Sequence, residues 1–333
     1  MKVPAAAVLA PGRRRPLTAI IAAERPPREG IAKKRLNPQS IAILGALHLA
    51  AAIAVVSVIR SPPSAKVWVL FAVMWVLPQV GITVGYHRME THNGFKCHPW
   101  VRAVLVVCGG MAVQGEVNGW VLNHRAHHHF QDQPGLDPHS PLEYPGLKGL
   151  LWAHVGWLLV RYERPAQFRT SARLEADPLA RWQRRWYVPL VGASLGIPFV
   201  VAGWDGLLVA GFLRVVLVLH ITWSVNSLCH KWGKPATDSV GNAYVADDSR
   251  NNRLVAVLAL GEGYHSNHHA QPTWAFHGWS RFSFDPSKWV IRSLETLGLA
   301  WGVRRPDPAV VFKPHQLRTD PLRTQTRMSG ARR

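Results

Sequence analysis

The chain contains few cysteines and few acidic residues for its length. Its 333 residues include three cysteines, Cys97, Cys108 and Cys229, which are too few and too irregularly spaced for a disulfide framework or a thiolate metal site. This composition fits a reducing compartment. The 19 Asp and Glu residues stand against 39 Lys and Arg residues, a formal net charge of +20. The N-terminus lacks an apolar run long enough for a secretory signal, and its arginines follow the short apolar piece.

The excess positive charge is concentrated near the two ends of the chain. Residues 1–40 contain nine Lys or Arg and two acids, and residues 303–333 contain eight and two, so the ends hold 13 of the 20 excess charges. A nucleic-acid-binding protein is expected to carry its basic residues on a folded reading surface, so this distribution argues against a nucleic-acid partner. Basic ends beside apolar segments indicate anionic lipid on the cytoplasmic face of a bilayer.

Four stretches have almost no charge and are long enough to cross a bilayer, which takes about 20 predominantly apolar residues. They are residues 41–59, 67–86, 186–204 and 207–228. Short turns join the first to the second and the third to the fourth, so each pair is predicted to form a hairpin. Residues 161–185 alone hold seven arginines against three acids. The positive-inside rule therefore predicts a multi-pass membrane protein with both termini and the active site in the cytoplasm.

The predicted fold is an all-α integral membrane protein with four transmembrane helices. A disordered basic tail is predicted at residues 1–38, a membrane domain at 39–303 and a second basic tail at 304–333. Within the domain, residues 87–185 and 229–303 are expected to form a cytosolic helical cap.

Two further apolar stretches are predicted to be amphipathic helices at the cytoplasmic interface. Val101–Leu122 carries polar residues at helical spacing, and Leu147–Val160 is too short to cross the membrane. Neither is expected to span.

Most of the 17 histidines gather in clusters at the predicted cytoplasmic ends of apolar segments. Helical residues three and four apart share one face, so such clusters can aim several imidazoles at one point. Imidazole suits iron, zinc, copper or nickel, and so many titratable rings at one bilayer depth are costly without a shared ligand. The candidate metal ligands are His87, His92, His124, His127, His128, His230, His265, His268 and His269. One metal ion cannot use nine imidazoles, so the count predicts two metals.

Other histidines stand alone in the sequence. Each is expected to be an ordinary side chain, either with its hydrogen bonds satisfied or facing solvent, and not a metal ligand. These residues are His48, His98, His220, His277 and His315.

The clusters His87–His92, His124–His128 and His265–His269 resemble the three histidine boxes of the membrane fatty acyl desaturases. Longer phrases resemble the stearoyl-CoA (delta-9) branch of that family. They are Gly81–Arg88, His124–His128, Asp137–His139, His154–Trp157, Thr222–Ser227 and Gly261–His265. The resemblance runs in order from about residue 40 to residue 303.

The resemblance implies a di-iron centre held by the nine histidines, with Asn226 as an indirect ligand through a water. This centre would itself be catalytic, with no separate side-chain nucleophile, because side chains alone cannot oxidise unactivated methylenes. With O₂ and two external electrons it would place a cis double bond, delta-9 by this resemblance, in a long saturated acyl thioester. Zinc binds nitrogen ligands more tightly than ferrous iron, so zinc is possible in a recombinant sample.

Six residues are expected to shape the substrate tunnel. By the resemblance, four residues form its bend, although ordinary helix packing is the alternative for each of them. They are Gln114, Trp120, Thr222 and Trp223. A bend can force the conformation that leads to a cis product. Trp75 and Gln79 are expected to close the end of the tunnel, and the bulky Trp75 predicts a limit on chain length.

Acids near the histidines are candidates for orienting the ligand imidazoles. They are Glu116, Asp137 and Glu262, and any one of them is alternatively a helix cap. His129 extends the second box but is not expected to bind metal, because the set His124, His127 and His128 is already complete.

The head-group region departs from the family's animal members. Leu122 and Asn123 replace an arginine–aspartate pair, and Gly115 replaces an asparagine. CoA is the expected carrier, with acyl carrier protein or a lipid as alternatives. Because no haem-binding signature, flavin or cysteine-rich segment is apparent, electrons are expected from a separate ferredoxin, rubredoxin or cytochrome b5-type protein, which a basic cap would attract.

Other functions remain open on the sequence alone. A histidine-box hydroxylase or monooxygenase acting on an alkyl chain would have nearly the same metal site. Two features distinguish a desaturase from such an enzyme: the tunnel residues Gln114, Trp120 and Thr222, and the product formed. A metal carrier or a haem cytochrome would place histidines inside the spans, where only His48 and His220 lie.

Overall fold

The computed structural model describes residues 34–161, 164, 166–237, 241, 243–245 and 247–307. Most of the two predicted basic tails lies outside these residues. The folded domain extends slightly beyond its predicted limits at both ends. Asn37 N donates to Leu159 O at 2.8 Å, and Arg304 N donates to Gly94 O at 2.8 Å.

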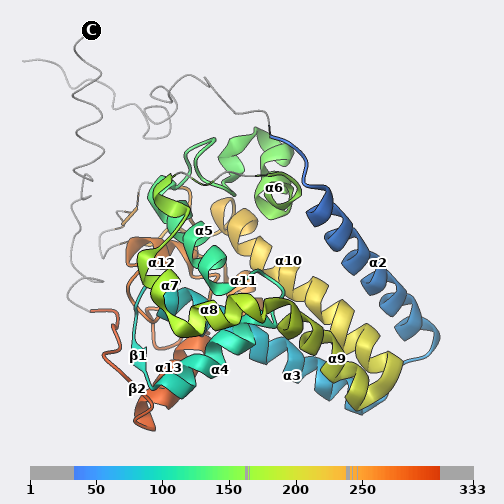
Figure 1. Ribbon diagram of the computed structural model, residues 1–333. Coiled ribbons are helices and arrows are strands. Elements are labelled where there is room, and N and C mark those ends of the chain that lie inside the picture. The colour runs from blue at the N-terminus through green and yellow to red at the C-terminus, as the bar shows by residue number, and fades with distance from the viewer. Residues whose placement is uncertain are drawn as a thin grey trace, which may run out of the picture. The chain divides into compact units, whose positions relative to one another are not determined.

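The described chain is almost entirely helical (Figure 1). Its α-helices are α2 (Pro38–Arg60), α3 (Ala65–Val80), α4 (Pro99–Gly110), α5 (Val117–Phe130), α6 (Gly146–His154), α7 (Ala172–Ala176), α8 (Pro178–Arg185), α9 (Tyr187–Asp205), α10 (Arg214–Ser227), α11 (Arg253–Leu258), α12 (His265–Ala270) and α13 (Pro286–Thr296). Two π-helices, η1 (Gly81–Thr91) and η5 (Gly206–Leu213), and the 3₁₀ turns η2 (Pro141–Glu143), η3 (Gly156–Leu159), η4 (Ala166–Phe168) and η6 (Leu228–His230) complete the helical structure. Strands β1 (Lys96–Cys97) and β2 (Ala300–Trp301) pair antiparallel.

Among the described residues, three helices are long and apolar enough to cross a membrane: Pro38–Arg60, Ala65–Thr91 and Tyr187–His230. The third has 44 residues, and its backbone leaves helical geometry at Ala202 (φ −138°, ψ 22°) and Gly203 (φ 60°, ψ −148°). Beyond this kink the chain packs closely on α9, since a Cβ added at Gly206 would lie 2.1 Å from Pro198 O. The break lies within the predicted span 186–204, just before the turn predicted at residues 205 and 206.

The second predicted span does not end at residue 86. The helix continues as the π-helix η1 through Thr91, and every residue of η1 is buried. The helix packs closely on α4 where η1 begins, since a Cβ at Gly81 would lie 2.1 Å from Gly109 N. His87 therefore projects from a helix inside the structure, and π-helical turns of this kind are frequent at functional sites.

The stretch Val101–Leu122 is not one amphipathic helix, contrary to the prediction. It is divided between α4 and α5, because Val113 and Gly115 adopt positive φ angles of 63° and 99°. A new helix then begins at Glu116, whose carboxylate accepts hydrogen bonds from Asn118 N and Gly119 N. Such a cap satisfies backbone donors that the first helical turn leaves free.

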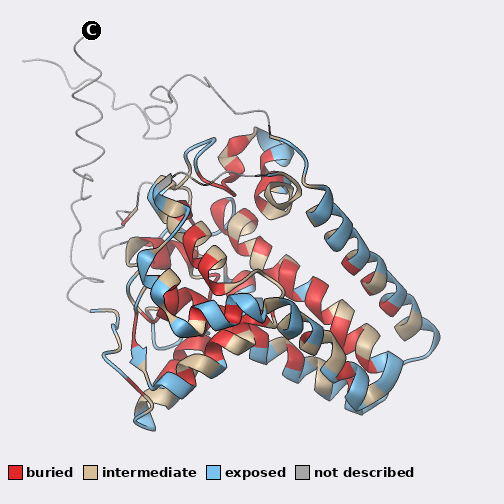
Figure 2. Cartoon of the chain, in the orientation of Figure 1, coloured by how far each residue is buried: buried red, intermediate tan, exposed pale blue. Residues whose placement is uncertain are grey.

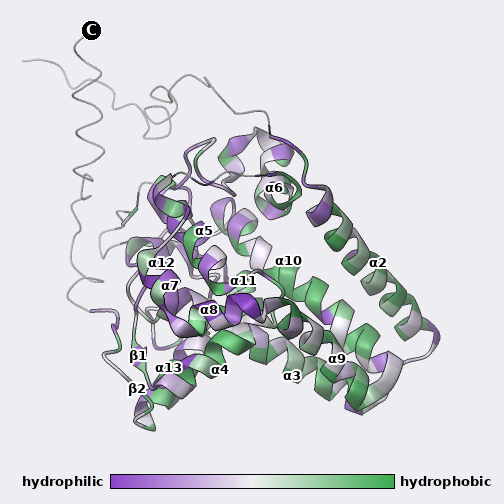
Figure 3. Cartoon of the chain, viewed as in Figure 1, coloured by the Kyte–Doolittle hydropathy of each residue, from purple (hydrophilic) through white to green (hydrophobic). Residues whose placement is uncertain are grey.

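Burial and hydropathy differ between the long helices and the histidine-bearing region. Helix α2 buries only Leu47, Ala51 and Ala54, and the rest of its largely apolar surface is exposed or half-exposed (Figure 2). Hydrophobic residues follow α2, α3, α9 and α10, whereas hydrophilic residues gather around α5, α7 and α12 (Figure 3). Long exposed apolar surfaces of this kind are typical of contact with lipid.

Candidate metal centre

Nine histidines converge in two adjoining groups. In each group, one ring nitrogen of every member lies within 4.8 Å of those of the others. The five-histidine group consists of His87, His92, His124, His128 and His268, and the four-histidine group consists of His127, His230, His265 and His269. These are the nine candidate ligands predicted from the sequence. Eight of them lie in η1, α5, η6 and α12, and His92 directly follows η1.

The spacing of the nitrogens fits metal coordination. In the five-histidine group, His268 Nε2 lies 2.9 Å from His87 Nε2 and 2.8 Å from His128 Nε2. In the four-histidine group, His230 Nε2 lies 3.0 Å from His265 Nε2. Metal–imidazole bonds of about 2.0–2.1 Å give nitrogen–nitrogen edges of about 3.0 Å in an octahedron and about 3.4 Å in a tetrahedron. Each group therefore fits one metal ion.

Carboxylates hold the outer nitrogens of two of these histidines. His87 Nδ1 donates to Glu262 Oε2 at 2.5 Å, and His127 Nδ1 donates to Asp137 Oδ2 at 2.9 Å. This arrangement fixes the tautomer, so that Nε2 is the free lone pair. Glu116, the third candidate, instead caps α5 and lies outside both groups.

Two further carboxylates were not anticipated from the sequence. His269 Nδ1 lies 3.2 Å from Asp247 Oδ2, and His230 Nδ1 lies 3.4 Å from Asp132 Oδ1. Burial alone would raise the pKa of Asp132, but the imidazole of His230 and several hydrogen bonds hold it well below its ordinary value. Both acids lie in loops that are distant in the sequence from the histidines that they contact, so sequence spacing does not identify them.

Most of the histidines with a perturbed pKa in the two groups favour the neutral imidazole; the exception is His230, whose pKa is raised because the carboxylate of Asp132 outweighs the effect of burial. Burial first, and neighbouring imidazoles second, lower the pKa of five of these histidines well below the ordinary value of 6.5. These histidines are His124, His128, His265, His268 and His269. A metal ligand must be deprotonated, so the electrostatics suit metal binding at neutral pH.

A buried arginine stabilises this arrangement. Arg88 is 1% exposed, and its guanidinium donates to Glu262 Oε1 and to Asp285 Oδ2 at 3.1 Å and 3.2 Å. Buried ions require close partners of opposite charge. Arg88 thereby holds the carboxylate that orients His87.

His277 is not the ordinary satisfied or solvent-facing residue that the sequence predicts. It is 1% exposed, and neither ring nitrogen makes a hydrogen bond. Its ring centroid lies 4.5 Å from that of His268, and its Nδ1 lies 3.6 Å from Glu262 Oε2. His139 similarly packs on His127, with ring centroids 4.4 Å apart, and burial lowers the pKa of His139 to about 3. The exposed His129 lies outside both groups.

Two histidines predicted to be isolated, His48 and His220, take part in a hydrogen-bonded chain. His48 Nδ1 lies 2.7 Å from Leu44 O, and His48 Nε2 lies 3.0 Å from His220 Nε2. His220 Nδ1 lies 2.9 Å from His154 Nε2, and His154 Nδ1 lies 3.0 Å from Ser227 Oγ. If His48 Nδ1 donates to Leu44 O, then His48 Nε2 accepts from His220 Nε2, and His220 Nδ1 accepts from His154 Nε2. His154 Nδ1 then accepts from Ser227 Oγ, whose single proton is shared with Trp223 O at 3.0 Å. The chain thus joins α2, α10 and α6.

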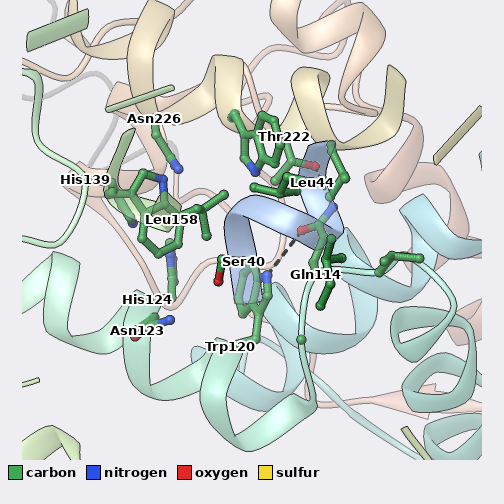
Figure 4. A pocket seen from close by; sticks show the side chains of 16 residues that line it. Ser40, Leu44, Gln114, Trp120, Asn123, His124, His139, Leu158, Thr222 and Asn226 are labelled. Carbon is green, nitrogen blue, oxygen red and sulfur yellow. Dashed lines mark hydrogen bonds between the residues drawn. The ribbon is translucent and has the colours of Figure 1, made fainter. Parts of the chain in front are cut away.

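Two cavities adjoin the histidines and share one wall. The outer cavity, of about 320 Å³, lies among α2, α5, α10 and η3 (Figure 4). A smaller inner cavity of about 50 Å³ reaches His87 and His265. Both are lined by Trp120, His124, Thr222 and Asn226.

The residues predicted to shape a tunnel take different places around these cavities. Gln114 and Trp223 line the outer cavity, where Gln114 Nε2 donates to Thr222 Oγ1 at 2.8 Å. Gln79 is buried and lines the inner cavity. Trp75 lines neither of these two cavities, but packs against the hydrophobic cluster that contains Val225 and Ala259, two residues of the inner cavity wall.

Comparison with known proteins gives concordant matches. The family model for fatty acid desaturase matches residues 62–282. The chain is 37% identical over 251 residues to the palmitoyl-monogalactosyldiacylglycerol delta-7 desaturase of Arabidopsis thaliana, an alignment that covers 72% of this chain and 62% of that protein. It is 36% identical over 248 residues to the sn-1 stearoyl-lipid 9-desaturase of Anabaena variabilis, covering 73% and 85%. It is 30% identical over 295 residues to human stearoyl-CoA desaturase 5, covering 84% and 85%.

Proposed function

Because the chain belongs to the fatty acid desaturase family, we propose that it is an O₂-dependent desaturase that introduces a cis double bond into a long saturated acyl chain. The observation that carries this proposal is the pair of adjoining histidine groups at the end of a two-part cavity. A delta-9 position is our specific expectation, although relatives with delta-7 and delta-9 names are both similar to the chain.

Two iron ions are the proposed cofactors, one in each histidine group. When bound, they supply the oxidising power for abstracting hydrogen from methylene carbons. The nine histidines would hold them, and Asn226, on the shared cavity wall, is proposed to hold a water beside one of them. Glu262, Asp137, Asp247 and Asp132 would keep the outer nitrogens of their histidines protonated, so that the inner nitrogens face the metals.

The cavity residues are proposed to position the acyl chain. Gln114, Thr222 and Trp120 would form the bend between the outer and inner cavities. Two hydrogen bonds support this role: Trp120 Nε1 donates to Gln114 Oε1 at 3.4 Å, and Gln114 Nε2 donates to Thr222 Oγ1 at 2.8 Å. Trp223 forms part of the outer wall, and Gln79 and Trp75 limit the inner end. Fixing one pair of methylenes near the histidines selects the bond position and the cis geometry.

We propose a topology of four transmembrane helices beneath a cytosolic cap. The kink at Ala202 and Gly203 supports counting Tyr187–His230 as two spans. The arginines of residues 161–185 support a cytoplasmic position for the cap and both termini.

The acyl carrier and the electron source complete the proposal. We propose an acyl thioester, with CoA as the first carrier to test and acyl carrier protein and lipid as alternatives, since relatives carry lipid and CoA names. Electrons would come from a separate ferredoxin, rubredoxin or cytochrome b5-type protein.

Gas chromatography–mass spectrometry of lipids from a host expressing the wild type or His268→Ala tests the activity. A new cis-monounsaturated acid only with the wild type supports desaturation and locates the bond. A hydroxylated product would favour an alkyl hydroxylase instead. No new product, from wild-type protein shown to be folded and metal-loaded, would overturn the proposal.

A further inference from the structure

A second large pocket lies on the outer side of α12 and is separate from the substrate cavity. It measures about 1060 Å³, and we call it the basic pocket because Lys234, Arg253 and Arg281 line it. It shares no lining residue with the outer or inner cavity. We infer that the basic pocket is the docking surface for a small acidic redox protein that delivers electrons to the histidine groups. This inference rests on the proposed desaturase function.

The charge of the basic pocket suits an acidic partner. Lys234, Arg253 and Arg281 are all exposed, and none of the lining residues in the described part of the chain is an acid. Complementary charge raises the rate of encounter and fixes orientation, which suits a short-lived electron-transfer complex.

An exposed aromatic side chain lies among these cations. Phe282 is 82% exposed, and the Arg281 guanidinium lies 4.6 Å from its ring centroid. An aromatic residue inside a charged rim is typical of the energetic centre of a protein interface. The basic pocket thus offers both steering charge and an apolar contact.

The floor of the basic pocket is the reverse side of the metal-binding helix. Tyr264 and Asn267 line the pocket, and their chain neighbours are His265 of the four-histidine group and His268 of the five-histidine group. A donor seated there would be separated from both groups by little more than the thickness of α12. Electrons could therefore reach either group through one or two backbone steps.

Reciprocal hydrogen bonds hold this floor in place. Asn251 Nδ2 donates to Asn267 Oδ1 at 2.8 Å, and Asn267 N donates to Asn251 Oδ1 at 3.1 Å. Asn252 N also donates to Gly263 O at 2.8 Å. A fixed floor keeps the donor-to-histidine distance constant, as repeated electron transfer requires.

The proposed reaction requires such a partner. A saturated –CH₂–CH₂– unit, one O₂, two electrons and two protons give one –CH=CH– unit and two waters, so O₂ is reduced and the acyl chain is oxidised. The acyl chain supplies two electrons, and the other two must come from the donor. A one-electron carrier must therefore dock twice in each turnover.

A charge-reversal experiment tests this surface. Metal-loaded Lys234→Glu/Arg253→Glu/Arg281→Glu protein in phosphatidylcholine vesicles is compared with the wild type, using stearoyl-CoA and a reduced plant-type [2Fe–2S] ferredoxin as the probe donor. The matched control is Arg181→Glu/Arg184→Glu/Arg185→Glu on α8, which changes the charge equally on another exposed surface. We expect the half-saturating ferredoxin concentration to rise roughly tenfold or more in the pocket variant and to stay near the wild-type value in the control.

Dithionite separates failure of this inference from failure of the proposed function. With dithionite as reductant, the pocket variant should form wild-type amounts of product, because a small reductant needs no docking surface. An unchanged ferredoxin dependence in the pocket variant would overturn the docking inference alone. No product from the wild type with either reductant, when stearoyl-CoA, stearoyl-acyl carrier protein and a stearoyl lipid are each offered as substrate, would overturn the desaturase proposal itself.

Anionic lipid is the competing occupant, because α11 also exposes Leu254 and Val257 beside Arg253. Repeating the titration with phosphatidylglycerol in the vesicles distinguishes the two. If the variant loses activity only in vesicles that contain this lipid, and loses it equally with dithionite, the pocket binds lipid and the inference is wrong. If charge reversal impairs metal loading, the Gln variants at the same three positions, together with the salt dependence of the wild type, provide the same comparison.

Discussion

Replacement of Glu262 by glutamine separates the orientation of a metal ligand from the stability of the protein. Glu262 Oε2 accepts the Nδ1 proton of His87 at 2.5 Å, while Oε1 lies 3.1 Å from Arg88 Nη2. Glutamine keeps the shape but removes the charge from both contacts. We therefore expect Glu262→Gln to weaken metal binding in the five-histidine group and to lower the free energy of unfolding.

The two effects have different expected sizes. Loss of an orienting carboxylate costs about 10–100-fold in metal affinity, which is about 1.4–2.7 kcal/mol. Removing one partner of a buried ion pair costs about 3–5 kcal/mol. Arg88 keeps Asp285, with Nη2 to Oδ1 at 3.0 Å, so the loss of stability should lie near the lower end of that range.

Chelator competition followed by elemental analysis measures the affinity, and thermal unfolding measures the stability. Glu175→Gln is the matched control, because this carboxylate is partly exposed and pairs with Arg184 at 3.3 Å outside the site. It should leave both quantities near wild type. Wild-type metal affinity in correctly folded Glu262→Gln protein would refute the orienting role of Glu262.

Three further predictions concern the cavity and the histidines. Trp75→Ala should allow longer acyl chains to be accepted. It should lower the free energy of unfolding by less than the value of about 3–5 kcal/mol that is typical when a fully buried tryptophan is replaced by alanine. An unchanged length limit in a series of substrates would disprove this role. Thr222→Val should remove the acceptor of the Gln114 hydrogen bond and lower the free energy of unfolding by about 1 kcal/mol. The double bond should then form at a shifted position or at several positions, so a single product with the wild-type bond position by mass spectrometry would contradict the proposed bend. The metal-free protein should lose stability as the pH falls below 6.5, the ordinary pKa of histidine, because unfolding frees His124, His265 and His268 to bind protons that burial otherwise prevents. Each such imidazole contributes at most about 1.4 kcal/mol per pH unit, and an unfolding profile that stays flat between about pH 7 and pH 5 would contradict their buried neutral state.

Local pattern predicts where the long apolar helices lie and which nine histidines converge, but not how these histidines divide into two groups. Three helices are long and apolar enough to cross a membrane, and one of them, Tyr187–His230, covers two of the four predicted spans. The clustered histidines of η1, α5 and α12 converge as their spacing suggests. The continuation of the second helix through Thr91 has no apolar signal in the sequence, because the residues from His87 to Thr91 are mostly polar although all are buried.

The parts of the site that sequence reasoning missed come from loops. Asp132, Asp247 and His277 reach the histidines only through tertiary folding, and no helical periodicity marks them. The sequence contains the phrase Asp137–His139, but the packing of these two residues around His127 arises only in the tertiary structure. The positive φ of Val113, which divides α4 from α5, likewise had no sequence signal because valine rarely adopts that conformation.

The count of metal ions per chain tests the central claim most directly. Elemental analysis of iron-reconstituted protein should find two irons per wild-type chain. His268→Ala, in the five-histidine group, and His265→Ala, in the four-histidine group, should each lower that count while the protein remains folded. A wild-type count of one, or two irons retained equally by both variants, would contradict the assignment of one metal to each histidine group.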